Sequence, residues 1–226
     1  MHRKGLGEQL LSLCSREENV LLIGPAGIGK TTLLKQISLD TPLLVCDETS
    51  SLGRICDCLE QKLGWRQGKS KIIQRKNRLL NYLEQRHEAV AFDQLAETPP
   101  RVARFIAHLI QKVPVWVVCR SDQRKEIGRL WEYLYNFTRV EVPPLSFVEA
   151  SALIRSAVDC GRIQADARKY DVALYRISKG VPGTLEGLLT ELAARNYKMN
   201  TAFGLRLLEL DRQIREAATA TARLPG

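Results

Sequence analysis

Residues 24–31 have the sequence Gly24-Pro25-Ala26-Gly27-Ile28-Gly29-Lys30-Thr31, which matches the pattern G-x-x-x-x-G-K-[ST]. Glycines let the backbone turn tightly and point its N–H groups at phosphate oxygens, and the positive end of a following helix faces the same oxygens. The lysine of such a loop reaches the β- and γ-phosphates of a nucleotide, and the hydroxyl after it coordinates Mg²⁺. The stretch therefore predicts a site for ATP and Mg²⁺ that uses Lys30 and Thr31.

The residues on either side supply the setting that a phosphate-binding loop needs. Val20-Leu21-Leu22-Ile23 is a continuous apolar run, typical of a buried strand. After the loop, Leu33, Leu34 and Ile37 recur at helical spacing, which predicts a helix over 30–39. We therefore expect the nucleotide to contact the residues Gly24, Pro25, Ala26, Gly27, Ile28, Gly29, Lys30, Thr31 and Thr32.

The first two-thirds of the chain alternates short apolar runs with helical stretches. Further strands are predicted at 43–46, 89–92, 115–119 and 139–142, and helices at 51–63, 70–86 and 101–112. Strands that alternate with helices form a parallel sheet with right-handed crossovers and helices on both faces. The pattern predicts an α/β fold with a five-stranded parallel sheet flanked by helices.

The pattern changes at Pro143-Pro144, after which no strand-like run follows. Helices are predicted over 146–160, 165–178, 182–197 and 201–222. Ser146 and Glu149 have the spacing of a capping box, which supports a helix start at this point. We expect a nucleotide-binding core over residues 1–144 and a small all-helical part over residues 145–226.

An acidic partner for the metal ion is expected at the end of a strand. Asp93 follows the predicted strand 89–92 and is the preferred ligand for Mg²⁺ together with Thr31. Asp47, at the end of the strand 43–46, is the competing carboxylate.

Gln94 follows Asp93, at a position where P-loop ATPases that polarise a water molecule often carry Glu. An amide can orient water, but it accepts a proton poorly. Three interpretations stay open: slow hydrolysis that lets the ATP state persist, a base supplied by Glu97 or Glu48, or a Glu-to-Gln replacement that traps ATP. We expect weak ATPase activity.

With these motifs, residues 5–197 resemble the AAA+ and STAND P-loop ATPases, in particular origin-recognition-type initiators and archaeal-type STAND ATPases. Residues 24–32 match their Walker A motif and residues 89–94 their Walker B motif. Residues 115–120 are similar to the sensor 1 strand. Two shorter matches are Gly5-Leu6-Gly7-Glu8-Gln9, similar to the segment beside the adenine, and Gly180-Val181-Pro182, similar to the Gly-x-Pro signature of STAND lids.

The resemblance implies roles for residues outside the loop. The helical part would be a lid over the nucleotide, with Pro182 packed near it, and Arg120 would sense the γ-phosphate. The catalytic group would then be Lys30, Asp93, Gln94 and Arg120. In assemblies of this kind a neighbouring subunit inserts an arginine, for which Arg124, Arg129 and Arg139 are the candidates. The chain departs from typical AAA+ proteins at Gln94 and at Gly183-Thr184, where no sensor 2 Arg is found.

The composition indicates the class of protein and its compartment. The 226 residues are 45% hydrophobic and 26% charged, which is typical of a folded globular chain. No stretch approaches the ~20 uncharged apolar residues of a membrane helix, so we expect no membrane partner. The six cysteines are scattered, several within apolar runs, which indicates buried thiols in a reducing cytoplasm.

The net charge of +9 is concentrated in one segment. Residues 66–86 hold seven basic residues and one acidic residue. On a helix, Ile72, Leu79 and Leu83 would face the core, whereas Lys71, Arg75, Arg78 and Tyr82 would form a separate stripe. The stripe predicts contact with the phosphates of nucleic acid through Lys71, Arg75 and Arg78. A solvated basic face and an acidic protein partner are the alternatives.

Together these features predict a slowly hydrolysing ATP switch of the AAA+/STAND type. It would bind ATP or ADP, and it would act on double-stranded DNA or in a DNA-associated assembly for replication, transposition or repair. In the ATP state it would associate with itself or with a partner protein. The alternatives are a non-hydrolysing nucleotide-binding scaffold or signalling module and, less favoured, a P-loop kinase for a small molecule.

Overall fold

The computed structural model describes residues 3–65, 70–86, 88–163 and 170–195, together with residues 210 and 213. The chain divides into two compact units, Met1–Pro143 and Pro144–Gly226. The helix predicted over 201–222 lies outside the described residues except at two positions, and the one predicted over 165–178 is described only from residue 170.

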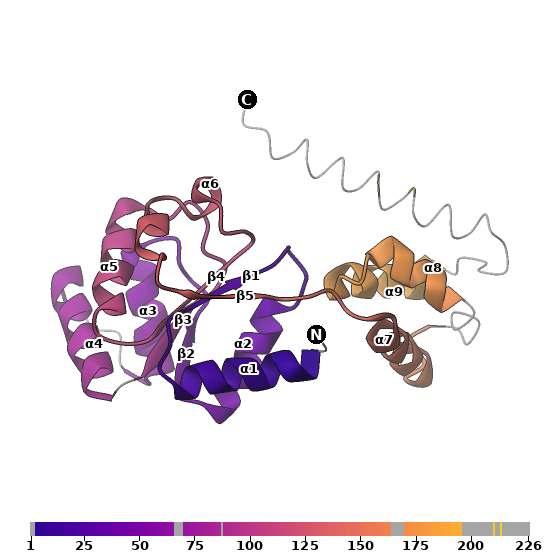
Figure 1. The fold of residues 1–226 in the computed structure, drawn as a ribbon, viewed down its shortest axis with the longest axis horizontal. Coiled ribbons are helices and arrows are strands. Elements are labelled where there is room, and N and C mark those ends of the chain that lie inside the picture. Colours follow the sequence, from indigo (N-terminus) through magenta and orange to yellow (C-terminus); the bar gives the residue numbers. More distant parts are fainter. Residues whose placement is uncertain are drawn as a thin grey trace. The chain divides into compact units, whose positions relative to one another are not determined.

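The first unit is built on five parallel strands in the order β2-β3-β4-β1-β5 (Figure 1). The parallel α/β sheet predicted from the sequence is confirmed. The central strands are buried along their whole length because helices cover the sheet, and β5 at one edge alternates buried and solvated residues. The strands are β1 (Val20–Ile23), β2 (Leu43–Cys46), β3 (Ala89–Phe92), β4 (Val115–Cys119) and β5 (Thr138–Glu141).

The helices predicted in this unit form within two residues of the expected bounds. A further helix, α1, was expected only as a short segment beside the nucleotide. Gly5 and Gly7 weaken the helical signal there, but Leu6 and Leu10 are fully buried, and their packing stabilises the helix. The helices are α1 (Arg3–Ser15), α2 (Lys30–Asp40), α3 (Leu52–Lys62), α4 (Ile72–Arg86), α5 (Pro100–Ile110), the short α6 (Arg124–Ile127) and the 3₁₀ helix η1 (Arg129–Tyr133).

The apolar face of α4 differs from the prediction at one end. Leu79, Leu80 and Leu83 are buried in the core of the unit, together with residues of α3 and α5. Ile72, expected to face the core, is 38% exposed. Ile72 is the first residue of α4, and the buried leucines lie from the middle of the helix onward.

The second unit contains α7 (Phe147–Asp159), α8 (Asp171–Ser178) and α9 (Pro182–Arg195) around an apolar core of its own. Ser146 caps α7: its hydroxyl accepts from the Glu149 N–H at 3.3 Å, and the Glu149 carboxylate accepts from the Ser146 N–H at 2.7 Å. The turn before α9 depends on Gly180, whose φ is 69°. A Cβ there would lie 2.6 Å from the Leu145 carbonyl oxygen, so only glycine fits.

Candidate functional site

The loop between β1 and α2 turns through two glycines with left-handed backbone conformations. Gly27 has a φ of 75°, and Gly29, the N-cap of α2, has a φ of 98°. The first helical hydrogen bond at this end is donated by the Leu33 N–H to the Gly29 carbonyl. The backbone N–H groups before Leu33 have no acceptor within the helix, because the helix does not extend one turn further back. The geometry is that of an anion-binding helix N-terminus.

Lys30 lies folded over its own loop. Its ammonium group donates hydrogen bonds to the carbonyl oxygens of Gly24 and, at 3.0 Å, of Pro25. The residue is only 9% exposed, and this burial lowers its pKa. The Asp93 carboxylate opposes that shift, whereas Arg120 adds to it.

Thr31 and Asp93 come together across the sheet edge, although they lie far apart in the sequence. The Thr31 hydroxyl donates to Asp93 Oδ2 at 2.6 Å, and Asp93 is fully buried. The backbone N–H of Asp93 donates to the Cys46 carbonyl at 2.9 Å, which holds the end of β3 against β2. The competing carboxylate of Asp47 instead accepts from Cys58 Sγ at 3.3 Å.

These residues fit a nucleoside triphosphate with a magnesium ion. The loop supplies backbone N–H donors at the start of α2 and a lysine, and the hydroxyl–carboxylate pair supplies the oxygen ligands that Mg²⁺ prefers. Within the described ranges, no three His, Cys, Asp or Glu side chains cluster as a metal site. Such an ion would complete its coordination with phosphate and water oxygens, as Mg²⁺ commonly does.

Gln94 turns away from the strand immediately after Asp93. Its φ is 56°, a left-handed conformation that is uncommon for residues other than glycine. Its backbone N–H donates to Asp93 Oδ1 at 2.9 Å, so this contact orients the buried carboxylate. The Gln94 residue itself is exposed. Glu48 and Glu97 are exposed as well, and their role as a base stays a prediction.

The segment after Gln94 pairs with the chain before η1, an arrangement that no sequence motif indicated. The N–H groups of Glu97 and Thr98 donate to the carbonyls of Glu126 and Ile127 at 2.7 and 3.2 Å. Gly128, with a φ of 73°, makes this approach possible, because a Cβ there would lie 2.9 Å from the Thr98 nitrogen. The end of β3 is therefore tied to the segment that carries Arg124 and Arg129.

The candidate arginines after β4 differ in their partners. Arg120 is exposed at the end of β4. Arg124 pairs with Glu132 at 3.0 Å and Arg139 with Asp122 at 3.9 Å. Over the part of the chain that the structure describes, Arg129 is exposed and has no carboxylate within ion-pair distance. The role of each in a neighbouring site stays a prediction.

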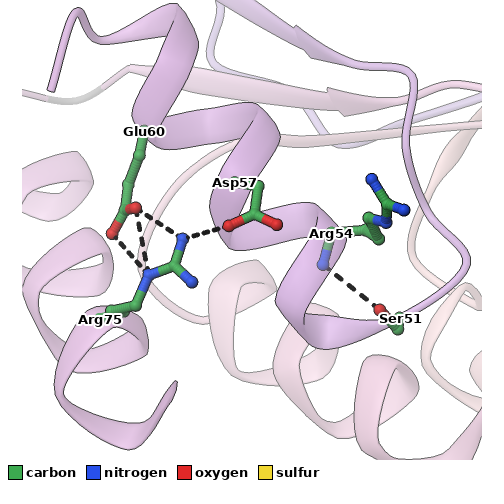
Figure 2. Close-up of polar contacts among 5 residues, drawn as sticks. All are labelled: Ser51, Arg54, Asp57, Glu60 and Arg75. Atoms are coloured by element: carbon green, nitrogen blue, oxygen red, sulfur yellow. Dashed lines mark hydrogen bonds and ion pairs between the residues drawn. The ribbon is translucent and has the colours of Figure 1, made fainter. Parts of the chain in front are cut away.

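Arg75, one of the residues of the basic stripe predicted on α4, is ion-paired within the unit, and its contact with nucleic acid stays a prediction. Figure 2 shows its guanidinium reaching across to two carboxylates of α3. Its Nε donates to both oxygens of Glu60 at 3.1 Å, and its Nη2 donates to Glu60 Oε2 and Asp57 Oδ1, each at 2.6 Å. The Arg75 side chain is only 14% exposed, and these carboxylates raise its pKa. The sequence pattern could not show this, because the partners lie on another helix.

The remaining predicted residues lie apart from this network. Lys71 and Arg78 are exposed. Pro182 is the first residue of α9 in the second unit, and its contact with nucleotide stays a prediction.

None of the helices that the structure describes is long and apolar enough to cross a membrane.

No family model and no curated protein sequence matches the chain. Among solved structures, similar folds are found in the Aeropyrum pernix Orc1 protein in complex with DNA, with 14% identity and a TM-score of 0.61 over 99% of this chain and 69% of that one. Domain III of the Thermotoga maritima replication initiation protein DnaA has 15% identity and a TM-score of 0.60, over 92% and 91%.

A STAND protein with a tetratricopeptide repeat sensor from Pyrococcus horikoshii has 16% identity and a TM-score of 0.52 over 89% of this chain. This chain spans about a third (31%) of that protein's length. The strand order, the loop before α2 and these likenesses agree with one another. The chain has the fold that it shares with Orc1 and with domain III of DnaA.

Proposed function

We propose that the chain is a switch ATPase that binds ATP with Mg²⁺, hydrolyses it slowly, and acts on DNA or in a DNA-associated assembly. The observation that carries this proposal is the hydrogen bond between Thr31 and Asp93 at the N-terminus of α2, where Lys30 is the first helical residue. A glycine loop, a lysine and a hydroxyl–carboxylate pair form the arrangement that binds a nucleotide polyphosphate and its metal ion.

In this proposal each side chain acts through the atoms that the structure brings together. Lys30 leaves the carbonyls of Gly24 and Pro25 and donates to the terminal phosphates, where the charge is greatest. Thr31 and Asp93 hold the metal ion, which supplies charge neutralisation at the phosphates when it is bound. Arg120, which directly follows β4, would respond to the γ-phosphate.

Slow turnover is supported by Gln94. Its amide can hold the attacking water by a hydrogen bond but accepts a proton poorly. ATP hydrolysis is therefore slow, and the ATP-bound state persists. A long-lived ATP state suits a switch, in which ATP favours one conformation or assembly and hydrolysis releases it.

Association with DNA is supported by the charge of the chain and by the proteins that share its fold. The excess of basic residues is concentrated at 66–86. The similar Orc1 structure is a complex with DNA, and DnaA is a replication initiation protein. Self-association in the ATP state belongs to the same proposal. Of the three candidate arginines, Arg124 and Arg139 are ion-paired, whereas Arg129 has no carboxylate partner among the described residues.

The test combines nucleotide binding with mass measurement. Native mass spectrometry of the full chain with ADP or ATP, each with and without duplex DNA, should show nucleotide-loaded chain and an ATP-dependent larger species. Lys30→Ala should remove nucleotide binding because it deletes the only side-chain cation of the loop. Equal ATP binding by Lys30→Ala and the unmodified chain would reject the site.

A second function is favoured by the same Gln94: a nucleotide-binding module that does not hydrolyse ATP. Tight ATP binding with no phosphate release, even with DNA present and at high protein concentration, would establish that function in place of the switch ATPase.

A further inference from the structure

The α3–α4 pair carries more positive than negative side chains, but only some of them are available to a partner. Arg75 is bound by Asp57 and Glu60 (Figure 2). Glu84, near the end of α4, is bound by Lys112. In both cases carboxylates of this region are already ion-paired. The cations that remain determine what the surface can bind.

Two of these remaining cations lie on aromatic rings. The guanidinium of Arg78 is 4.0 Å from the ring centre of Trp65, and that of Arg86 is 5.6 Å from the ring centre of Tyr82. The two rings meet edge to face, with their centres 4.9 Å apart. We call these four side chains, Trp65, Arg78, Tyr82 and Arg86, the arginine–aromatic ladder. Three of its members recur every four residues along α4, and Trp65 follows α3.

The ladder holds its guanidinium groups in defined positions. Trp65 and Tyr82 are partly buried and pack against the core, so they cannot swing freely. A guanidinium that lies on a ring has fewer accessible rotamers and keeps its N–H groups free at its edge. Neither Arg78 nor Arg86 has a carboxylate partner in the described segments, and both residues are exposed. They therefore present unpaired, ordered positive charge.

From this arrangement we infer that the ladder is a binding site for the phosphodiester backbone of duplex DNA, with Arg78 and Arg86 each contacting a phosphate. Charge complementarity selects the partner, because two forked cations without carboxylates match phosphates. The two arginines are eight residues apart, roughly 12 Å along a helix, so each can meet a separate phosphate. The inference rests on the DNA-associated function proposed above and names its contact surface.

The same geometry argues against recognition by base stacking. Single-strand binding surfaces offer free aromatic faces on which successive bases lie. Here an arginine lies over a face of each ring, and the rings pack against each other and against the core. The ladder is therefore suited to the backbone of a duplex, and contact of this kind carries no base sequence preference.

Arg75 has a supporting place in this surface. By joining α4 to α3 it fixes the helix that carries Arg78 and Arg86 relative to the chain that carries Trp65. The contact surface thus differs from the stripe predicted by sequence. It keeps Arg78 and adds Arg86, and it contains neither Lys71 nor Arg75.

The experiment measures duplex binding by the full chain as a function of salt, by fluorescence anisotropy of a labelled mixed-sequence duplex with ATP and Mg²⁺. Each lost phosphate contact reduces the slope of log affinity against log salt by about 0.9. The double variant Arg78→Ala/Arg86→Ala should therefore bind more weakly with a slope shallower by about 2.

The matched control is Arg101→Ala/Arg104→Ala on α5. It removes two exposed arginines of the same unit, neither of them ion-paired among the described residues, and changes the net charge equally. The control should keep the slope of the unmodified chain. Equal losses in the two double variants would overturn the inference, because the effect would then come from total charge rather than from the ladder.

Two further arms identify the ligand. A single strand of the same length should bind more weakly than the duplex, and poly-glutamate should not compete at equal charge. Tighter binding of the single strand, or displacement of duplex by poly-glutamate, would contradict duplex phosphate as the partner.

ATP binding by the unmodified chain, measured in the same samples, separates the two proposals. Failure of the unmodified chain to bind ATP would reject the proposed function. ATP binding with an unchanged slope in Arg78→Ala/Arg86→Ala would reject the ladder alone.

Discussion

Lys30 holds its ammonium group against the carbonyls of its own loop, where burial lowers its pKa. These hydrogen bonds satisfy a nearly buried cation. A bound triphosphate would offer oxygens of full negative charge in place of the neutral carbonyls of Gly24 and Pro25. The exchange favours the nucleotide because hydrogen bonds between charged groups are stronger than those with one neutral partner.

The first prediction at the residue scale concerns Gln94. Gln94→Glu should raise the rate of phosphate release roughly 100-fold, in the range that a positioned general base supplies. Both side chains have the same length, and both would adopt the same left-handed backbone, so the geometry around Asp93 should persist. ATP affinity, measured alongside, is the control. No gain in turnover with normal affinity would contradict the missing-base explanation.

A second prediction at this scale concerns the thiols. Burial raises the pKa of Cys56 to about 11 and that of Cys119 to about 12, and it also raises the pKa of Cys46. Since the thiolate is the reactive form, these cysteines should resist iodoacetamide near neutral pH, whereas the exposed Cys160 should react. Peptide mass spectrometry would locate the label. Early labelling of Cys46 would show that β2 opens readily.

At the scale of elements, the α3–α4 pair depends on one buried ion pair. Arg75→Met should lower the free energy of unfolding by about 3–5 kcal/mol, because Glu60, whose side chain is 3% exposed, would keep a buried charge without its partner. Urea unfolding measures the change. Arg75→Met/Glu60→Leu should regain most of the loss, since an apolar pair of similar volume can replace a buried ion pair.

The control for that prediction is an exposed ion pair of the same unit. Arg124 and Glu132 approach to 3.0 Å, but their side chains are 70% and 58% exposed. Arg124→Ala should change stability by less than about 1 kcal/mol, because water screens such pairs. A similar loss in both variants would show that burial is not what makes Arg75 important.

Gly128 gives a further prediction for the link between the end of β3 and η1. Gly128→Ala should destabilise the chain by more than about 1 kcal/mol, because φ is positive there and a Cβ would lie 2.9 Å from the Thr98 nitrogen. Gly187→Ala, within α9 and with open space around it, should instead stabilise by about 0.5–1 kcal/mol. Thermal unfolding of both variants checks the opposite signs.

At the scale of the whole molecule, ligand binding should appear as stability. A ligand that binds only the folded chain adds about 2.7 kcal/mol at one hundred times its dissociation constant. ATP with Mg²⁺ should therefore raise the melting temperature of the unmodified chain but not that of Lys30→Ala. A rise in melting temperature for both would place the nucleotide elsewhere than the loop before α2.

Much of this molecule followed from local sequence patterns. The five strands and the main helices follow from apolar runs and helical spacing, and the loop at 24–31 follows from its glycines, since a tight turn before a helix is a local property. Helix α1 was not predicted, because its stability comes from the burial of Leu6 and Leu10 against the rest of the unit and not from the helix propensity of its residues.

The parallel α/β unit and its phosphate-binding loop could be predicted without coordinates, because backbone conformation and hydrophobic period are encoded in neighbouring residues. Which side chains contact one another became clear only from the folded structure. In that structure Thr31 donates a hydrogen bond to Asp93, Arg75 forms an ion pair with Glu60, and the guanidinium of Arg78 lies over the ring of Trp65. Such pairings join residues on different elements, so their energies depend on distances that the order of residues along the chain does not specify.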